Sequence, residues 1–294
     1  MDTPFAQRQF KLGLFLALLA SLMFSLKPIF IKQAYELGAS SEGLMILRMW
    51  LALPFYLVIL MLNKNSFALI RQYKVSIFAM GFLGYFLSSY LDLLALQFIS
   101  AQAERIILYA YPSLVVLMKA IYDKKLPNKN ILLAMALVYV GLIVLLPGEL
   151  NLQGSLFGLA LMALCAMSFA LYVILSKPMI NKLGTTAFTS AAMLASIALT
   201  QVHFVKVDAT EIITYEHNIW MLALALAFFS TVIPSYAMSA AIKYIGSEKT
   251  AITGSTGPVF TVILAAVILG EQITLFHMAG LSLVVVGVFL LGRK

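Results

Sequence analysis

The stretch LGLFLALLASLMFSLKPIFIK at residues 12–32 decides the fold, because a version of it returns as FGLALMALCAMSFALYVILSK at residues 157–177. Each stretch is long and apolar enough to cross a membrane as one helix. At an offset of 145 residues the identical positions include Gly13/Gly158, Leu14/Leu159, Leu16/Leu161, Leu19/Leu164, Phe24/Phe169, Leu26/Leu171 and Lys32/Lys177. The pattern indicates that the chain contains the same hydrophobic helix twice.

Leucine-rich helices match by chance, so the repeat needs support from outside these two stretches. Later positions supply it at an offset of 146 residues: Ser89-Tyr90 with Ser235-Tyr236, Ala95 with Ala241, Ile99 with Ile245, Ile106 with Ile252, Pro112 with Pro258 and Gly141 with Gly287. The sequence therefore predicts two units, at residues 1–150 and 151–294. Many secondary transporters are built from such duplicated membrane units.

Composition excludes an ordinary soluble domain. Hydrophobic residues make up 62% of the chain and charged residues only 11%, whereas a soluble domain carries about 25% charged residues. The single cysteine, Cys165, lies within an apolar segment and is expected to be a small packing residue that forms no disulfide within the chain.

Ten apolar stretches of membrane-spanning length follow one another, five in each unit. They are residues 12–33, 43–62, 75–98, 103–122, 130–147, 154–175, 187–206, 218–243, 249–269 and 274–292. We therefore expect an all-α integral membrane protein with ten transmembrane helices.

Charged loop residues predict the orientation. Most loop Lys and Arg residues, such as those of 124–129 and 293–294, fall on the side of the N-terminus, and most loop Asp and Glu residues fall on the other side. Positively charged loops stay in the cytoplasm, so both termini are expected there. Five is an odd number of spans, and the second unit therefore enters the membrane inverted relative to the first.

The second half ends in TGPVFTVILAAVILGEQITLFHMAGLSLVVVGVFLL at residues 256–291, and the first half places Tyr109, Tyr111 and Pro112 at a similar point. These features resemble the EamA-type transporters of the drug/metabolite transporter superfamily. The resemblance covers nearly the whole chain, although the first half has Lys124-Lys125 where the second has Gly270-Glu271. It implies export or exchange of small metabolites, often amino acids, across a bacterial inner membrane.

Ionisable residues inside the apolar stretches are candidate functional groups, because each costs at least ~2.5 kcal/mol at a helix centre unless it is paired or hydrated. Counted at the helical rise, Lys27, Arg48 and Asp92 fall in one layer, with Glu104 and Arg105 just above it. Their counterparts in the second unit are uncharged, as in Lys27/Tyr172 and Asp92/Met238. The layer is predicted to act as an outer gate or a substrate contact; a permanent structural ion pair is the alternative.

Prolines and glycines mark where the helices open, because a proline frees a backbone carbonyl. The candidate hinge residues are Pro28, Pro112, Pro234, Gly254, Gly257 and Pro258. A cavity with aromatic walls is expected near them, lined by Tyr90, Tyr109, Tyr111, Tyr172, Ser235, Tyr236, Ser255 and Thr256. Close helix packing and interface anchoring are the alternative roles of these residues.

The sequence therefore favours a secondary transporter for amino acids or related zwitterions that works by alternating access. A multidrug or organic cation exporter is the alternative, and an enzyme or a channel is disfavoured: His203, His217 and His277 lack metal-site spacing, so no metal, cofactor or catalytic residue is expected. The expected partners are the lipid bilayer, a small solute and, as a candidate coupling ion, the proton. Nucleic acid is not expected, and the protein is expected to be a monomer or a weak homodimer.

Overall fold

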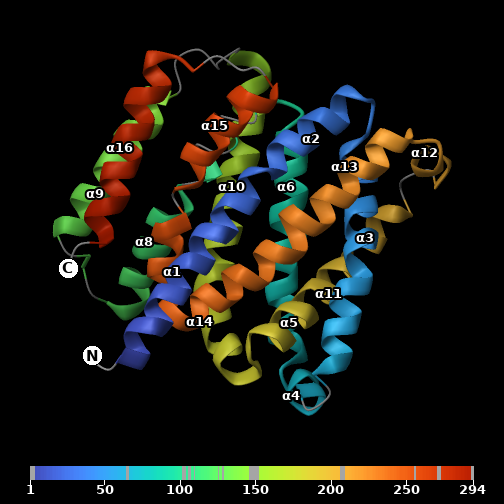
Figure 1. Ribbon diagram of the computed structural model, residues 1–294, viewed down its shortest axis with the longest axis horizontal. Coiled ribbons are helices and arrows are strands. Elements are labelled where there is room, and N and C mark those ends of the chain that lie inside the picture. The colour runs from blue at the N-terminus through green and yellow to red at the C-terminus, as the bar shows by residue number, and fades with distance from the viewer. Residues whose placement is uncertain are drawn as a thin grey trace.

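A computed structural model describes the chain except residues 1–3, 64–65, 101–103, 105–106, 109, 125, 128, 146–151, 206–208, 255, 270–272 and 293–294. The described residues form helices joined by short turns, without a strand (Figure 1). In the first half these are α1 Pro4–Ser25, α2 Lys27–Glu36, α3 Ser41–Leu62, α4 Phe67–Gln72, α5 Lys74–Gly81, the π-helix η2 Phe82–Leu87, α6 Ser88–Ala95, α8 Tyr111–Asp123 and α9 Lys129–Leu145.

The second half contains α10 Leu152–Leu183, α11 Thr185–Phe204, α12 Ala209–Ile213, α13 His217–Ala227, the π-helix η3 Phe228–Val232, α14 Ile233–Gly254, α15 Gly257–Leu269 and α16 Leu275–Gly292. Helices thus occupy all ten apolar stretches predicted from the sequence. Within the described part, six helical runs are long and apolar enough to cross a membrane, and α8, α15 and α16 contribute shorter apolar helices. The chain is a multi-pass membrane protein, and the number of ten spans stays a prediction.

The two halves pack on each other through a pair of equivalent helix crossings. A Cβ atom at Gly13 of α1 would lie 2.7 Å from Cγ2 of Ile245 in α14, and one at Gly158 of α10 would lie 2.7 Å from Cγ2 of Ile99, just after α6. Gly13 and Gly158 are counterparts in the sequence repeat, and so are Ile99 and Ile245. Small residues let membrane helices approach closely, so each half offers a glycine to the other.

Helix breaks also occur at equivalent places. Ala110 and Thr256 form the turns that precede α8 and α15. The two turns have the same hydrogen-bond pattern: Ala110 N donates to Ile107 O at 3.0 Å, and Thr256 N donates to Thr253 O at 3.2 Å. Both helices then begin with a proline in the first turn, Pro112 or Pro258, where a missing N–H costs nothing.

A further break lies within α14, at Gly246, whose φ of 84° is left-handed. A helix that ends there leaves its last carbonyls without helical donors. The ammonium group of Lys177 in α10 donates to two of them, Ile242 O at 2.6 Å and Lys243 O at 2.7 Å. This basic group therefore caps a helix of the same half.

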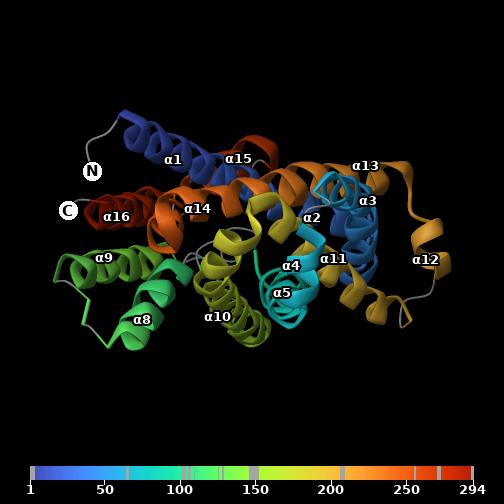
Figure 2. The same ribbon diagram turned by 90° about the horizontal axis from the view of Figure 1, so that it is seen from below.

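The helices form two unequal groups. Seen from below, α8, α9 and α16 lie to one side, and α3, α11, α12 and α13 lie to the other, with α10 and α14 between them (Figure 2). The largest buried cluster draws on α3, η2, α10, α11 and α14 and includes Tyr56, Tyr85, Tyr172, Phe188 and Met238. Apolar side chains on the outside, such as Phe15 and Val58, suit a surface that faces lipid.

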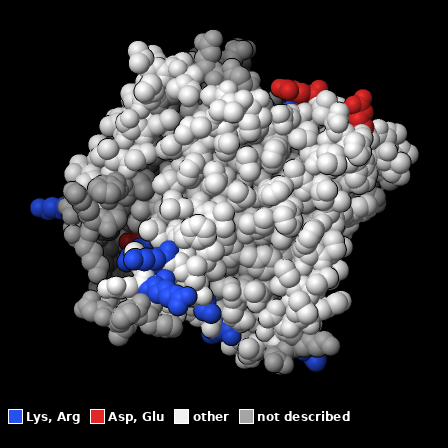
Figure 3. Space-filling model, in the orientation of Figure 1, with Lys and Arg blue, Asp and Glu red and all other residues white. Residues whose placement is uncertain are grey.

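Charge separates to two ends of the molecule. Figure 3 shows Lys and Arg gathered at the lower left, and Asp and Glu at the upper right. At an acidic loop, the phenol of Tyr215 donates to Glu211 Oε1 at 2.7 Å and accepts from Ser40 N at 3.1 Å. Burial raises the pKa of Tyr215, so the phenol keeps the proton that it donates to Glu211.

Candidate functional site

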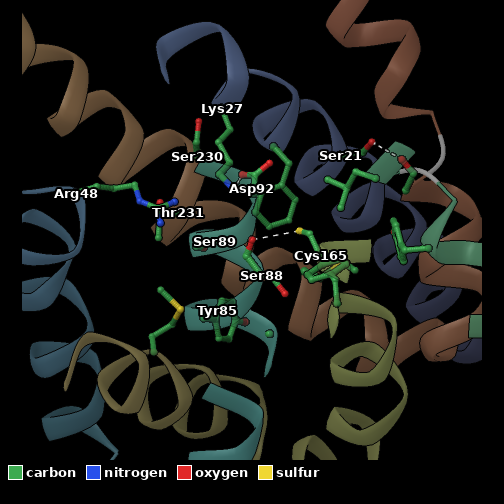
Figure 4. Close-up of a pocket in the computed structure, with 18 of the residues that line it drawn as sticks. Ser21, Lys27, Arg48, Tyr85, Ser88, Ser89, Asp92, Cys165, Ser230 and Thr231 are labelled. Atoms are coloured by element: carbon green, nitrogen blue, oxygen red, sulfur yellow. Dashed lines mark hydrogen bonds and ion pairs between the residues drawn. The ribbon is translucent and has the colours of Figure 1, made fainter. Parts of the chain in front are cut away.

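A cavity lies where the two halves meet. The space in it that is open to a water-sized molecule amounts to about 90 Å³, which is less than the ~300–1,000 Å³ typical of small-molecule sites. Its wall draws on both halves at matching positions, as the sequence counterparts Phe24/Phe169, Gly84/Ser230, Tyr85/Thr231, Asp92/Met238 and Leu108/Gly254 all line it. Figure 4 shows side chains of both halves converging on this space.

Some residues of the cavity wall stand four positions before a proline. A proline cannot donate to the carbonyl four residues earlier in a helix. For Pro28, Pro112, Pro234 and Pro258 those residues are Phe24, Leu108, Ser230 and Gly254, and all four line the cavity. Proline-containing helices of both halves therefore meet at one cavity.

Hydroxyl groups of α1 form hydrogen bonds with backbone carbonyls at the break before α15. Ser21 Oγ donates to Gly254 O at 2.9 Å, and Ser25 Oγ lies 3.0 Å from Gly257 O. Gly254 O is the carbonyl that Pro258 deprives of its helical donor. A side chain of the first half thus replaces a missing backbone bond of the second.

Two π-helical turns contribute to the wall of the cavity. η2 contributes Gly84 and Tyr85 and η3 contributes Ser230 and Thr231. A π-turn widens the helix by one residue per turn and is frequent at functional sites. A Cβ atom at Gly84 would collide with the ring of Tyr172, so this glycine allows η2 to approach α10.

The charged layer predicted from the sequence is assembled here. Lys27 begins α2 directly after the break at Leu26, and its Nζ forms an ion pair with Oδ2 of Asp92 in α6. Arg48 of α3 lines the same cavity and is only 2% exposed. All three charges come from the first half, and the side chain of Met238, the counterpart of Asp92, also lies in the wall.

The other predicted site residues fall in different places. Tyr111 lines the cavity. The remaining predicted residues that the structure describes are not part of the lining. Three of them pair with a hydroxyl group: Tyr172 OH lies 2.6 Å from Tyr85 OH, Ser235 Oγ lies 2.9 Å from Tyr56 OH, and Tyr236 OH lies 2.6 Å from Ser190 Oγ. Thr256 Oγ1 donates to Thr253 O, Tyr90 stacks on Phe86, and Glu104 is buried. Arg105, Tyr109 and Ser255 lie outside the described residues.

The sequence reasoning missed several residues of the wall. Tyr85, Ser88, Thr231 and Met193 all line the cavity. The repeat offset could have pointed to Thr231 once Tyr85 was known, but no local sequence pattern marks a π-turn. Cys165, predicted to be a packing residue, is buried in the wall and donates to Ser88 O at 3.2 Å.

Metal chemistry finds no support in the part of the chain that the structure describes. No group of three or more His, Cys, Asp or Glu side chains is placed there to hold an ion. The polar groups that line the cavity are hydroxyls and the three charges of Lys27, Arg48 and Asp92. Such a set can bind a small polar solute by hydrogen bonds and charge.

Comparison with known proteins agrees with this architecture. The model of the EamA-like transporter family matches residues 11–146 and again residues 156–293. A Bacillus subtilis (strain 168) protein named uncharacterized transporter YcbK is 29% identical over 287 residues, which cover 93% of this chain and 90% of that relative. The Bacillus subtilis uncharacterized transporter YyaM is 23% identical, over 82% and 81% of the two chains.

A third relative and one solved structure extend the likeness. An uncharacterized transporter of Archaeoglobus fulgidus is 22% identical in sequence over 84% of this chain and 87% of its own. One crystal structure of another protein superposes with a TM-score of 0.70 at 17% identity, covering 95% of each chain, which shows a common fold. With both halves matched by one family model, the chain belongs to the EamA-like transporter family.

Proposed function

We propose that the protein is a secondary transporter that moves small metabolites, amino acids or related zwitterions, by alternating access. The observation that carries this proposal is the convergence of four proline-containing helices, two from each half, on one cavity: the chain breaks next to Pro28, Pro112 and Pro258, and Pro234 follows the π-turn η3. In transporters, broken helices of two repeats build the solute site, and rocking of one repeat against the other opens it to either side.

The repeat geometry supports two inverted units. The crossing of α1 on α14 has its counterpart in α10 on α6, and a reciprocal pair of contacts is expected when two copies are related by a twofold axis. The start of α1 and the end of α16 lie on the same side of the molecule (Figure 1). With the basic end in the cytoplasm, both termini are cytoplasmic in the bacterial inner membrane.

The Lys27–Asp92 pair is proposed to be part of the working site. It joins helices 65 residues apart in sequence and lines the cavity. An ion pair with no function would be a costly way to fill a buried wall. As a gate or a solute contact, the pair would break and reform during each cycle.

An exporter of organic cations is the second candidate, and the charge of the cavity speaks against it. Its described lining holds two basic groups and one acidic group, and the acidic group is paired with Lys27. A cation would therefore enter a site with a net positive charge.

Transport by the purified full chain in proteoliposomes tests the proposal. Vesicles loaded with an unlabelled amino acid should accumulate the labelled one by counterflow, without any ion gradient, because a carrier exchanges solute through one site. Ion current in the same vesicles would instead indicate a channel. Repeating the uptake with an imposed pH gradient would show whether protons are coupled. Counterflow of an organic cation but of no amino acid would move the assignment to the second candidate.

A further inference from the structure

Arg48 is the charged group of the described lining that is not part of the Lys27–Asp92 ion pair. It lies in the first half of α3, is 2% exposed, and Figure 4 shows its guanidinium among the side chains of the wall, close to Thr231. Among the described residues, none accepts a hydrogen bond from its Nε or its Nη2. Buried guanidinium groups are normally paired, so Nε and Nη2 of Arg48 can bind an acceptor that the described residues do not provide.

The neighbouring charges do not cancel it. Lys27 and Asp92 form their own ion pair, which leaves Arg48 as the source of the net positive charge of the described lining. Its counterpart in the second half, at the offset of 145 residues, is Met193, which also lines the cavity. An apolar side chain therefore fits the equivalent place, and packing alone does not require an arginine.

The geometry points to a solute carboxylate as the missing acceptor: Arg48 binds the carboxylate of the transported solute through Nε and Nη2. This assignment rests on the proposed transport function and narrows its substrates to carboxylate-bearing solutes. A guanidinium edge offers two parallel N–H donors, and a carboxylate accepts both at once. Lysine cannot reproduce this fork.

The walls are consistent with an α-amino acid as the carboxylate-bearing solute. Its ammonium group would require acceptors, and the carbonyls of Phe24 and Leu108 lose their helical donors to Pro28 and Pro112. Both residues line the cavity. Aromatic and apolar side chains such as Phe169 and Met238 would surround the rest of the solute.

Cys165 provides a test that needs no knowledge of the solute, because it is the chain's single cysteine and lines the same cavity. In the full chain in detergent, the rate of its modification is measured with an anionic sulfonatoethyl, a cationic trimethylammonioethyl and a neutral methyl methanethiosulfonate. We expect the anionic reagent to react faster than the cationic one, and Arg48→Met to reduce this ratio about tenfold. Arg71→Gln, on exposed α4, is the matched control and should leave the ratio unchanged.

Thermal shifts then identify the recognised group. L-leucine, L-phenylalanine and L-serine are each compared with their amide, their 2-hydroxy acid and their decarboxylated amine. Shifts should require the carboxylate and should vanish in Arg48→Met, while the ligand-free protein stays at least as stable as wild type because a buried charge has been removed. Arg48→Lys should not restore the full shift.

The outcomes separate this assignment from the transport proposal. If the reagents reach Cys165 but Arg48→Met leaves their ratio unchanged, the role of Arg48 is overturned and the cavity remains a solute site. If even the neutral reagent fails to react, the cavity is closed to solutes and the proposed function fails with it. Loss of stability in ligand-free Arg48→Met would show a structural arginine and overturn the assignment.

Discussion

The hydroxyl of Ser21 in α1 donates a 2.9 Å hydrogen bond to the carbonyl of Gly254, 233 residues later in the chain. That carbonyl needs a donor because Pro258 cannot supply one. The bond thus fastens the first half to the broken helix of the second, directly at the cavity wall.

Ser21→Ala should therefore destabilise the protein by about 1–3 kcal/mol, the cost of a buried acceptor left without its donor. Unfolding of the purified protein in detergent by heat or denaturant measures the loss. Ser282→Ala is the control, since that exposed hydroxyl bonds only to Met278 O of its own helix. Equal stability of the two variants would show that Gly254 O finds another donor.

Pro258→Ala restores an N–H opposite Gly254 O and so favours a continuous helix through the break. We expect a protein at least as stable as wild type but slower in counterflow, because the opening at Thr256 is proposed to be used in transport. Pro178→Ala, within the continuous helix α10, tests whether loss of any proline has the same effect. Unchanged transport in Pro258→Ala would remove this break from the mechanism.

Lys27→Ala leaves Asp92 buried without its ion-pair partner and should destabilise the protein by about 3–5 kcal/mol. The double variant Lys27→Tyr with Asp92→Met copies the counterparts in the second half, removes both charges and should recover most of that stability. Counterflow is then measured on the stable double variant. Retained transport there would leave the pair a purely structural role, whereas lost transport would support a gate or a solute contact.

Gly13→Ala and Gly158→Ala should lower stability by similar amounts, about 1–3 kcal/mol each, because an added methyl group overpacks each crossing. The new Cβ atom would meet Tyr244 Cβ at 2.8 Å in one case and Phe98 Cβ at 3.0 Å in the other. Phe15→Leu, on the outside of α1, serves as the control. A large effect at only one glycine would argue against equivalent crossings.

Much of the architecture could be predicted from the sequence. The duplication, the breaks at Pro28, Pro112 and Pro258, and the common depth of Lys27 and Asp92 all follow from spacing and from proline chemistry. The directions in which the tyrosine side chains point could not be predicted from the sequence. Tyr172 lies in a helix whose polar residues gather on no single face, and such a helix does not tell which side points inward.

The sequence by itself determined that two copies of one membrane unit carry a proline at matching places, Pro112 and Pro258, and that the layer of Lys27, Arg48 and Asp92 belongs to only one copy. The tertiary structure decided which charges pair. Lys27 and Asp92 are 65 residues apart, and only the packing of their helices brings them together while leaving Nε and Nη2 of Arg48 without an acceptor among the described residues. Ion pairing is a matter of a few ångströms between side chains, and a linear pattern fixes the depth of a residue in the membrane but not its neighbours.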